Sequence, residues 1–274
     1  MISTLIVNHN GEAHLARCLT SLGPLPRPGL EVLLVDNASS DRSLELVRRD
    51  FPAVRILALD MNCGFAAANN QAAAEARGEH LLLLNSDAWL VDDCLDRLLA
   101  RLEGDPTLAL VCPTLHYPDG TRQISWAPDR SVLGELVEKV RNRFEASPWV
   151  HARWLRAGLG ASWYPATCML LRREAFAEVG GFDAGYFLYF EDADLCLRLR
   201  RRGWQMALVE EARAVHCSGG SPGSGGATLA YRQSQVRYYE QHRPRWEQVV
   251  LGWHLRRKFS SGPVAGWLRE KLEP

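Results

Sequence analysis

The chain has 274 residues, the size of one large domain or of two closely packed ones. Hydrophobic residues make up 47% and charged residues 23%, which is typical of a folded globular protein and excludes a disordered one. The 32 Lys and Arg residues balance 32 Asp and Glu residues, so the overall charge does not favour nucleic acid as a partner.

The first part of the chain alternates between apolar runs and helical patterns. The runs at 4–7, 32–35, 54–57 and 81–84 are each followed by a helix-like stretch, at 12–22, 41–50, 65–77 and 92–103. Strands that are apolar on both faces and alternate with helices are typical of a mostly parallel sheet flanked by helices. We therefore predict an α/β fold whose ligand binds at the carboxyl ends of the strands.

Each of these four predicted strands runs into a cluster of polar and turn-forming residues. The clusters are 8–11, 36–41, 62–65 and 85–87. Asn, Asp, Ser and Gly also make good turns and helix caps, which explains any one cluster by itself. Four such clusters in succession at one rim favour a binding site.

The second part of the chain has a different pattern. Residues 114–165 mix Pro, Trp and Arg around a short helical stretch near 131–145, and we interpret them as a region that faces the acceptor. The apolar segment 167–171 is predicted to return to the sheet. Further helices are expected at 172–179, closed by Gly180 and Gly181, and from about the acidic motif at 191 to Arg202.

The end of the chain is expected to be a loop followed by helices. Residues 216–228 form a Gly/Ser-rich segment, and residues 227–274 hold nine Lys and Arg residues against four Asp and Glu residues. We predict three parts: a nucleotide-binding half at 1–113, an acceptor and catalytic half at 114–226, and a basic helical extension at 227–274.

Asp87 is the first candidate for chemistry, because it follows a buried run of leucines. A carboxylate at that place can hold Mg²⁺ or Mn²⁺, which usually takes one or two carboxylates together with substrate phosphates. The alternative is that Asp87 caps a helix that begins beyond Trp89.

Glu191, Asp192 and Asp194 form a second candidate group at the predicted start of a helix. The helix dipole stabilises acidic side chains there, which explains at least one of them without a function. Aromatic residues flank the group, at 186, 187, 189 and 190. Carboxylates in such surroundings can have perturbed pKa values, which suits a general base.

His216 heads the Gly/Ser-rich segment. A single histidine is usually structural. Here its neighbours supply backbone N–H groups and hydroxyls without bulk, as a loop that wraps a phosphate requires, and imidazole is a suitable ligand for Mn²⁺.

Five ordered segments resemble those of inverting family 2 glycosyltransferases, most closely a rhamnosyltransferase-like branch. They are 4–10, 35–41, 62–69, 83–87 and 180–196. This resemblance implies the GT-A fold, a nucleotide-diphospho-sugar donor bound at the strand rim, and a divalent metal, Mg²⁺ or Mn²⁺, at the diphosphate.

The resemblance also implies roles for individual residues of the nucleotide site. Asp36 corresponds to the carboxylate that reads the base, and Asn8 lines the nucleoside pocket. Asn62 and Gly64 approach the nucleotide. Asn85 stands where a two-aspartate motif has its first acid.

The remaining implied roles concern the metal and the reaction. Asp87 corresponds to the metal-binding aspartate, and His216 to a histidine that joins the metal or the diphosphate. Asp192 corresponds to the catalytic base, with Glu191 and Asp194 as supporting acids or alternative assignments.

The expected activity is transfer of a sugar, with inversion, to a hydroxyl of a saccharide or lipid-linked saccharide during cell-surface polysaccharide synthesis. The resemblance suggests dTDP-rhamnose as donor, and a UDP- or GDP-sugar stays open. A nucleotidyltransferase, or a non-catalytic sugar-binding protein on the same fold, is the alternative.

Compartment and membrane contact are inferred from composition. Seven cysteines at scattered spacings suit a reducing compartment, and the start of the chain lacks the basic region of a signal peptide, so we expect a cytoplasmic protein. The basic, Trp-bearing segment 240–274 either contacts the inner face of the membrane or is a solvated helix face whose tryptophans pack on the catalytic domain.

Overall fold

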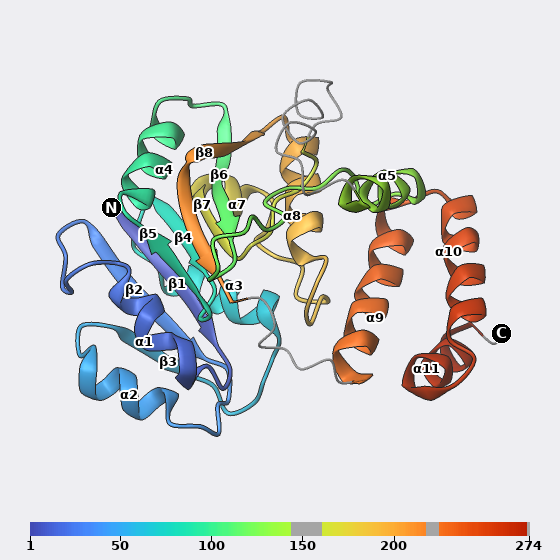
Figure 1. The fold of residues 1–274 in the computed structure, drawn as a ribbon, viewed down its shortest axis with the longest axis horizontal. Coiled ribbons are helices and arrows are strands. Elements are labelled where there is room, and N and C mark those ends of the chain that lie inside the picture. The colour runs from blue at the N-terminus through green and yellow to red at the C-terminus, as the bar shows by residue number, and fades with distance from the viewer. Residues whose placement is uncertain (144–160, 218–224, 273–274) are drawn as a thin grey trace.

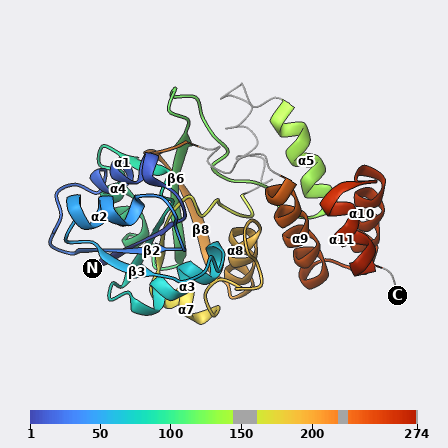
Figure 2. The same cartoon turned by 90° about the horizontal axis from the view of Figure 1, so that it is seen from below.

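The computed structural model describes residues 1–143, 161–217 and 225–272. Its centre is an eight-stranded sheet in the order β3-β2-β1-β4-β7-β6-β8-β5, with helices on both sides (Figure 1). At the end of the molecule away from β2 and β3, a group of helices from the C-terminal part of the chain packs beside α5 (Figures 1 and 2).

The first part of the sheet confirms the predicted strand–helix alternation. Strands β1, β2, β3 and β4 are all parallel. The elements in chain order are β1 (Ile2–Asn8), α1 (Glu12–Thr20), β2 (Leu30–Asp36), α2 (Ser43–Asp50), β3 (Arg55–Ala58), α3 (Phe65–Glu75) and β4 (His80–Leu84).

The second part of the sheet is mixed. Strands β7 and β5 run antiparallel to their neighbours, so four of the seven neighbouring pairs are parallel. The return of the chain at β7 was expected, whereas β5, β6 and β8 were not. The elements are β5 (Ala88–Val91), α4 (Cys94–Glu103), β6 (Leu108–His116), α5 (Val132–Arg143), β7 (Cys168–Arg172), α7 (Arg173–Glu178), α8 (Glu191–Arg201) and β8 (Gln205–His216).

The C-terminal segment is helical, as its composition predicts. It consists of α9 (Gly225–His242), α10 (Arg245–Lys258) and α11 (Gly262–Leu272). Helix α9 begins inside the segment 216–228 that we expected to be a loop. Residues 144–160 of the predicted acceptor region and 218–224 of the Gly/Ser-rich segment lie outside the described residues. No helix in the described ranges is both long and apolar enough to cross a bilayer.

Two layers of buried side chains explain why the central strands are apolar throughout. Leu81 and Leu83 of β4 belong to the core on one face of the sheet, and Leu82 and Leu84 to the core on the other. Successive side chains of a strand point to opposite faces, so a strand covered on both sides needs an unbroken apolar run.

The strand directions bring several distant segments to one edge of the sheet. The carboxyl ends of β1, β2 and β4 share that edge because these strands are parallel. Strand β7 runs against β4, so the residues just before Cys168 reach the same edge. Strands β6 and β8 again run parallel to each other, and their carboxyl ends also lie there.

The start of α3 is joined to the segment that precedes α8. The backbone N–H of Phe65 donates a hydrogen bond to the carbonyl oxygen of Phe187 (2.8 Å). Gly64 makes this approach possible, because its φ is +84° and a Cβ there would lie 2.5 Å from that same oxygen. This contact ties the first part of the chain to the part that holds the acidic motif.

Replacing Gly64 by alanine is expected to destabilise the protein more than the same change at Gly120. Both glycines have positive φ, at +84° and +85°, so both variants incur a backbone cost of about 1 kcal/mol. At Gly120 nothing lies within 4 Å of the added Cβ, so only Gly64→Ala also displaces Phe187. Urea unfolding measures both losses of free energy, and equal losses would contradict the close contact.

Candidate active site

Asn8 and Asp36 stand side by side at the ends of β1 and β2. They are paired in the register of these strands, and both are buried. The Asn8 Nδ2 amide donates to Asp36 Oδ1 (3.1 Å), and the backbone N–H of Ser39 donates to Asp36 Oδ2 (3.1 Å). The carboxylate predicted to read the base is therefore held in one orientation.

Hydrogen bonds to Asn62 stabilise the loop that precedes α3. Its Oδ1 accepts hydrogen bonds from the Asn37 Nδ2 amide (2.9 Å) and from the backbone N–H of Gly64 (3.0 Å). Asn37 is buried and also accepts from the backbone N–H of Cys63 (2.9 Å). Sequence analysis did not single out Asn37, because an Asn beside Asp36 looks like an ordinary turn residue.

Asp87 and His216 are brought together by the ladder between β5 and β8. Ala88 is the register partner of His216, so Asp87, one residue earlier, lies beside the imidazole. The Asp87 Oδ1 is 3.3 Å from His216 Nε2. His216 is thus the last residue of a strand, not the first of a loop as we predicted, and Asp87 precedes a strand, so the helix-cap explanation for it does not apply.

Gln123 determines which nitrogen of His216 carries a proton. Its Nε2 amide donates to the carbonyl oxygen of His216 (2.6 Å), which leaves its Oε1 as an acceptor 3.0 Å from His216 Nδ1. Nδ1 must therefore donate its proton to this Oε1. In the neutral imidazole, Nε2 then carries a lone pair that faces the Asp87 carboxylate. Two acceptors at this distance require a proton or a cation between them.

The charge of Asp87 also suits a cation. Burial acts to raise the pKa of Asp87, but when a proton occupies His216 Nε2, the hydrogen bond and the positive charge of the imidazolium outweigh burial and lower this pKa below its usual value. The carboxylate is therefore ionised at neutral pH.

The donor set fits a divalent metal only if the substrate completes it. No group of three or more His, Cys, Asp or Glu side chains in the described part of the chain is arranged to hold a metal ion. Asp87 and His216 supply one oxygen and one nitrogen, and Mg²⁺ or Mn²⁺ commonly takes its other ligands from phosphates and water. Asn85, in the same turn, has a buried Oδ1 without a partner among the described residues.

Asp192 is the second residue of α8, which begins directly after two residues in the left-handed conformation. Tyr189 and Phe190 have φ values of +70° and +68°, a conformation that costs energy for residues other than glycine. Asp192 is half-buried, and its Oδ1 accepts from the backbone N–H of Ala193 (2.7 Å). The two strained residues turn the chain into α8, and this turn places the Asp192 carboxylate in the first turn of the helix.

The two adjacent carboxyl groups differ in their electrostatics. Burial raises the pKa of Asp192 to about 6, against the charge of Arg130 and the backbone N–H of Ala166, which lower it. Burial and the neighbouring Asp192 raise the pKa of Glu191 well above its usual range. Glu191 is therefore kept neutral, and Asp192 is the member of the pair that is ionised at neutral pH.

Asp194 is engaged in a buried ion network. Its Oδ2 accepts from Arg198 Nε (2.7 Å) and its Oδ1 lies 2.7 Å from His242 Nε2. Because His242 belongs to α9, this network fastens α9 to α8. Both oxygens of Asp194 are occupied by these partners.

Contacts along the rim connect the separate parts of the site. The backbone N–H of Asn85 donates to the carbonyl oxygen of Thr167 (2.9 Å), and the preceding Ala166 N–H is bonded to Asp192. Residues 166–167 therefore bridge the turn that carries Asp87 and the start of α8.

A second connection joins β1 to that turn. A Cβ at Gly11 would lie 2.2 Å from Asn8 Oδ1 and 3.2 Å from Ser86 Oγ. The loop after β1, which holds Asn8 against Asp36, therefore lies against the Asp87 turn. In this way the rim gathers Asp36, Asp87, His216 and Asp192.

Arg130 is a further residue that sequence analysis missed. Its guanidinium lies over the ring of Trp163 (4.2 Å) and near that of Phe190 (5.1 Å), and its charge acts on Asp192. Arg130 and Gln123 both come from the irregular region 114–165. No motif or period marks them there, so only the fold identifies them.

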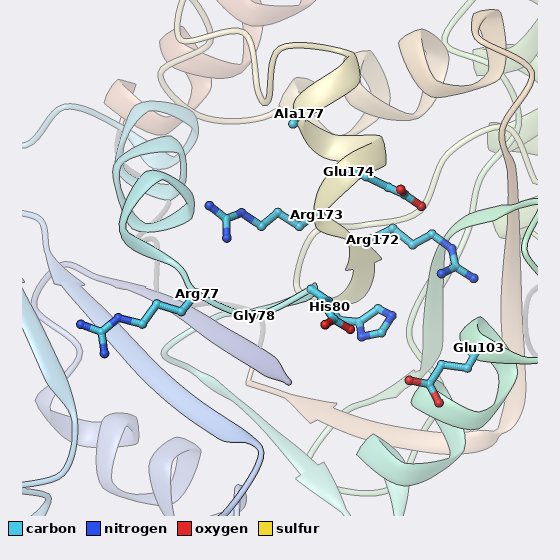
Figure 3. A pocket seen from close by; sticks show the side chains of 9 residues that line it. Arg77, Gly78, His80, Glu103, Arg172, Arg173, Glu174 and Ala177 are labelled. Carbon is cyan, nitrogen blue, oxygen red and sulfur yellow. The ribbon is translucent and has the colours of Figure 1, made fainter.

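A cavity of about 680 Å³ lies away from this rim, between the opposite ends of β4 and β7 (Figure 3). His80 begins β4 and Arg172 ends β7. Arg172 donates to the carbonyl oxygens of Leu102 (2.7 Å) and Leu108 (2.9 Å), so its charge is used to hold α4 and β6. The cavity holds three arginines and three glutamates, so it favours neither sign of charge.

Comparisons with known proteins bear on the family and the fold of this chain. The model of the family described as Glycosyl transferase family 2 matches residues 3–180. An N-acetylglucosaminyl-diphospho-decaprenol L-rhamnosyltransferase of Mycobacterium tuberculosis is 29% identical over 274 aligned residues, which cover 93% of this chain and 89% of that protein.

Two solved structures share the fold. The mannosyltransferase PcManGT from Pyrobaculum calidifontis, in complex with GDP-Man and Mn²⁺, matches with a TM-score of 0.62 and 18% identity. The match covers 98% of this chain and 79% of PcManGT. GalNAc-T7 with UDP, GalNAc and Mn²⁺ matches with a TM-score of 0.65 and 18% identity. The match covers 99% of this chain and 54% of the GalNAc-T7 chain.

Proposed function

Because this chain belongs to glycosyl transferase family 2 and is a glycosyltransferase with the GT-A fold, we propose that it transfers a rhamnosyl group from dTDP-rhamnose to a lipid-linked saccharide. The similarity to a rhamnosyltransferase that acts on a decaprenol-linked N-acetylglucosamine supports this sugar and this class of acceptor. The convergence of Asp36, Asp87, His216 and Asp192 on one rim is the observation that carries the proposal.

The donor is bound by the ends of β1, β2 and β4. Asp36, held by Asn8 and by the backbone of Ser39, accepts hydrogen bonds from the nucleoside. Asp87 and His216 would hold a divalent cation, which would supply positive charge near the departing diphosphate. Gln123 keeps the Nε2 lone pair of His216 directed at this place.

Asp192 is the proposed general base. Its carboxylate takes the proton of the acceptor hydroxyl as that oxygen attacks the anomeric carbon. The bond from that carbon to the diphosphate breaks in the same displacement, so the configuration is inverted. Glu191 stays protonated next to it, and its neutrality spares Asp192 the repulsion of a second negative charge.

The acceptor is proposed to bind between residues 182–192 and the region 114–165. Phe187 offers a half-exposed ring there, directly over Gly64. An aromatic ring held by a hydrogen-bonded backbone presents an apolar surface for a sugar at low entropic cost.

Asp192→Asn is expected to abolish transfer while leaving donor binding intact, because asparagine cannot accept the proton. In the wild type, kcat/KM should fall about tenfold per pH unit below pH 6 as Asp192 becomes protonated, and should level off above that pH. Product formation followed across pH measures both effects.

Asp194→Asn is the matched control for this substitution. It removes charge from the ion network with Arg198 and His242, so stability should fall while turnover persists. Substantial turnover in Asp192→Asn, or its complete loss in Asp194→Asn with the fold intact, would show that the base is assigned to the wrong residue.

dTDP-rhamnose with Mn²⁺ is expected to raise the melting temperature more than UDP-N-acetylglucosamine or GDP-mannose at the same concentration. A donor at 100 times its Kd adds about 2.7 kcal/mol of stability. EDTA, or the substitution Asp87→Asn, should remove most of the shift and stop turnover. An undiminished shift and full turnover in EDTA would contradict the metal assignment, and a shift with the other sugars alone would contradict the donor.

A further inference from the structure

One side of helix α10 is fixed to the rest of the protein. Leu251 and Leu255 are buried. Glu247, one turn earlier on the same side, is buried as well, and its Oε2 accepts a hydrogen bond from the backbone N–H of Val132 at the start of α5 (2.9 Å). The spacing of four residues puts all three on one side of the helix, which determines the direction of the other side.

The other side of α10 exposes a stripe of large apolar side chains, called here the Trp246 face. Trp246, Val249, Val250 and Trp253 are 59%, 67%, 41% and 58% exposed. Their spacing of three and four residues places them in a single stripe. A helix that is apolar on opposite sides is normally covered on both, and an exposed apolar patch of this kind marks an interaction surface.

Positive charge borders the Trp246 face. Arg256, Arg257 and Lys258 are exposed in the last turn of α10, and the Arg257 guanidinium lies 5.5 Å from the Trp253 ring. Glu247, the one acidic residue of α10, is buried on the other side. The surface therefore combines tryptophan, aliphatic side chains and cations, without a negative charge from its own helix.

This combination distinguishes between possible occupants. A second copy of this face would offer Arg256, Arg257 and Lys258 no acidic partner from α10, because Glu247 is buried on the other side. An anionic lipid surface offers phosphates to the cations, an apolar layer to the valines, and the interface at which tryptophan is enriched in membrane proteins.

We propose that the Trp246 face docks on the headgroup region of an anionic bilayer, with α10 lying in the plane of the surface. The inference rests on the proposed function, because a lipid-linked acceptor is presented by a bilayer. Helix α10 lies at the end of the molecule opposite β2 and β3, where the sheet does not obstruct such a contact (Figures 1 and 2).

Flotation of the full-length protein with vesicles tests the proposal. The wild type is expected to float with vesicles of equal parts phosphatidylglycerol and phosphatidylcholine and to stay behind with phosphatidylcholine alone. The double variant Trp246→Ala/Trp253→Ala should bind the anionic vesicles about tenfold less, and Arg256→Gln/Arg257→Gln should also bind less. Exposed Tyr117→Ala and Arg48→Gln, outside α10, are the matched controls and should float like the wild type.

Two readouts keep this test separate from that of the proposed function. Both tryptophans are exposed, so the double variant should keep its melting temperature and its turnover of a water-soluble acceptor, and Asp192→Asn should float normally. Flotation without any transferase activity would refute the proposed function and leave the docking face intact. Undiminished flotation of the double variant, or a change from dimer to monomer in it without vesicle binding by the wild type, would overturn the docking proposal.

Discussion

The antiparallel ladder between β5 and β8 is the constraint on which the candidate site depends. It places His216 beside Asp87, although the two residues are far apart in the sequence. Gln123 accepts a hydrogen bond from Nδ1, so that Nε2 of the neutral imidazole is left as an acceptor facing the Asp87 carboxylate. Two such acceptors repel each other unless a proton or a cation lies between them, and the proposed metal site rests on this arrangement.

The acid motif depends on a different support. The left-handed residues Tyr189 and Phe190 turn the chain into α8, and α9 holds this segment through hydrogen bonds from Ser234 to the Leu188 carbonyl oxygen (2.8 Å) and between Tyr186 and Gln241 (2.8 Å). The cost of the strained backbone is thereby offset by packing from the C-terminal part of the chain. Helix α9, which supports the acidic motif, is followed directly by α10, which bears the Trp246 face.

The sequence predicts the first part of the fold well, because buried parallel strands require unbroken apolar runs such as 81–84. It predicts less of the second part. Strand β5 is only four residues long, and β8 carries charges at Glu210, Glu211 and Arg213, so neither has the pattern of a buried strand. The candidate site follows the same division: Asp36 and Asp87 stand at the ends of recognisable strands. The position of His216 in a strand and the contributions of Gln123 and Arg130 come from contacts between distant segments, which no local pattern records.

A crystal structure of the protein with dTDP and Mn²⁺, in which the metal is located by its anomalous scattering, tests the convergence of these residues most directly. We expect the metal between Asp87 and His216, the thymine ring of dTDP against Asp36, and the Asp192 carboxylate facing the open side of the diphosphate. Metal or nucleotide bound instead at the opposite edge of the sheet, near His80 and Arg172, would contradict the account.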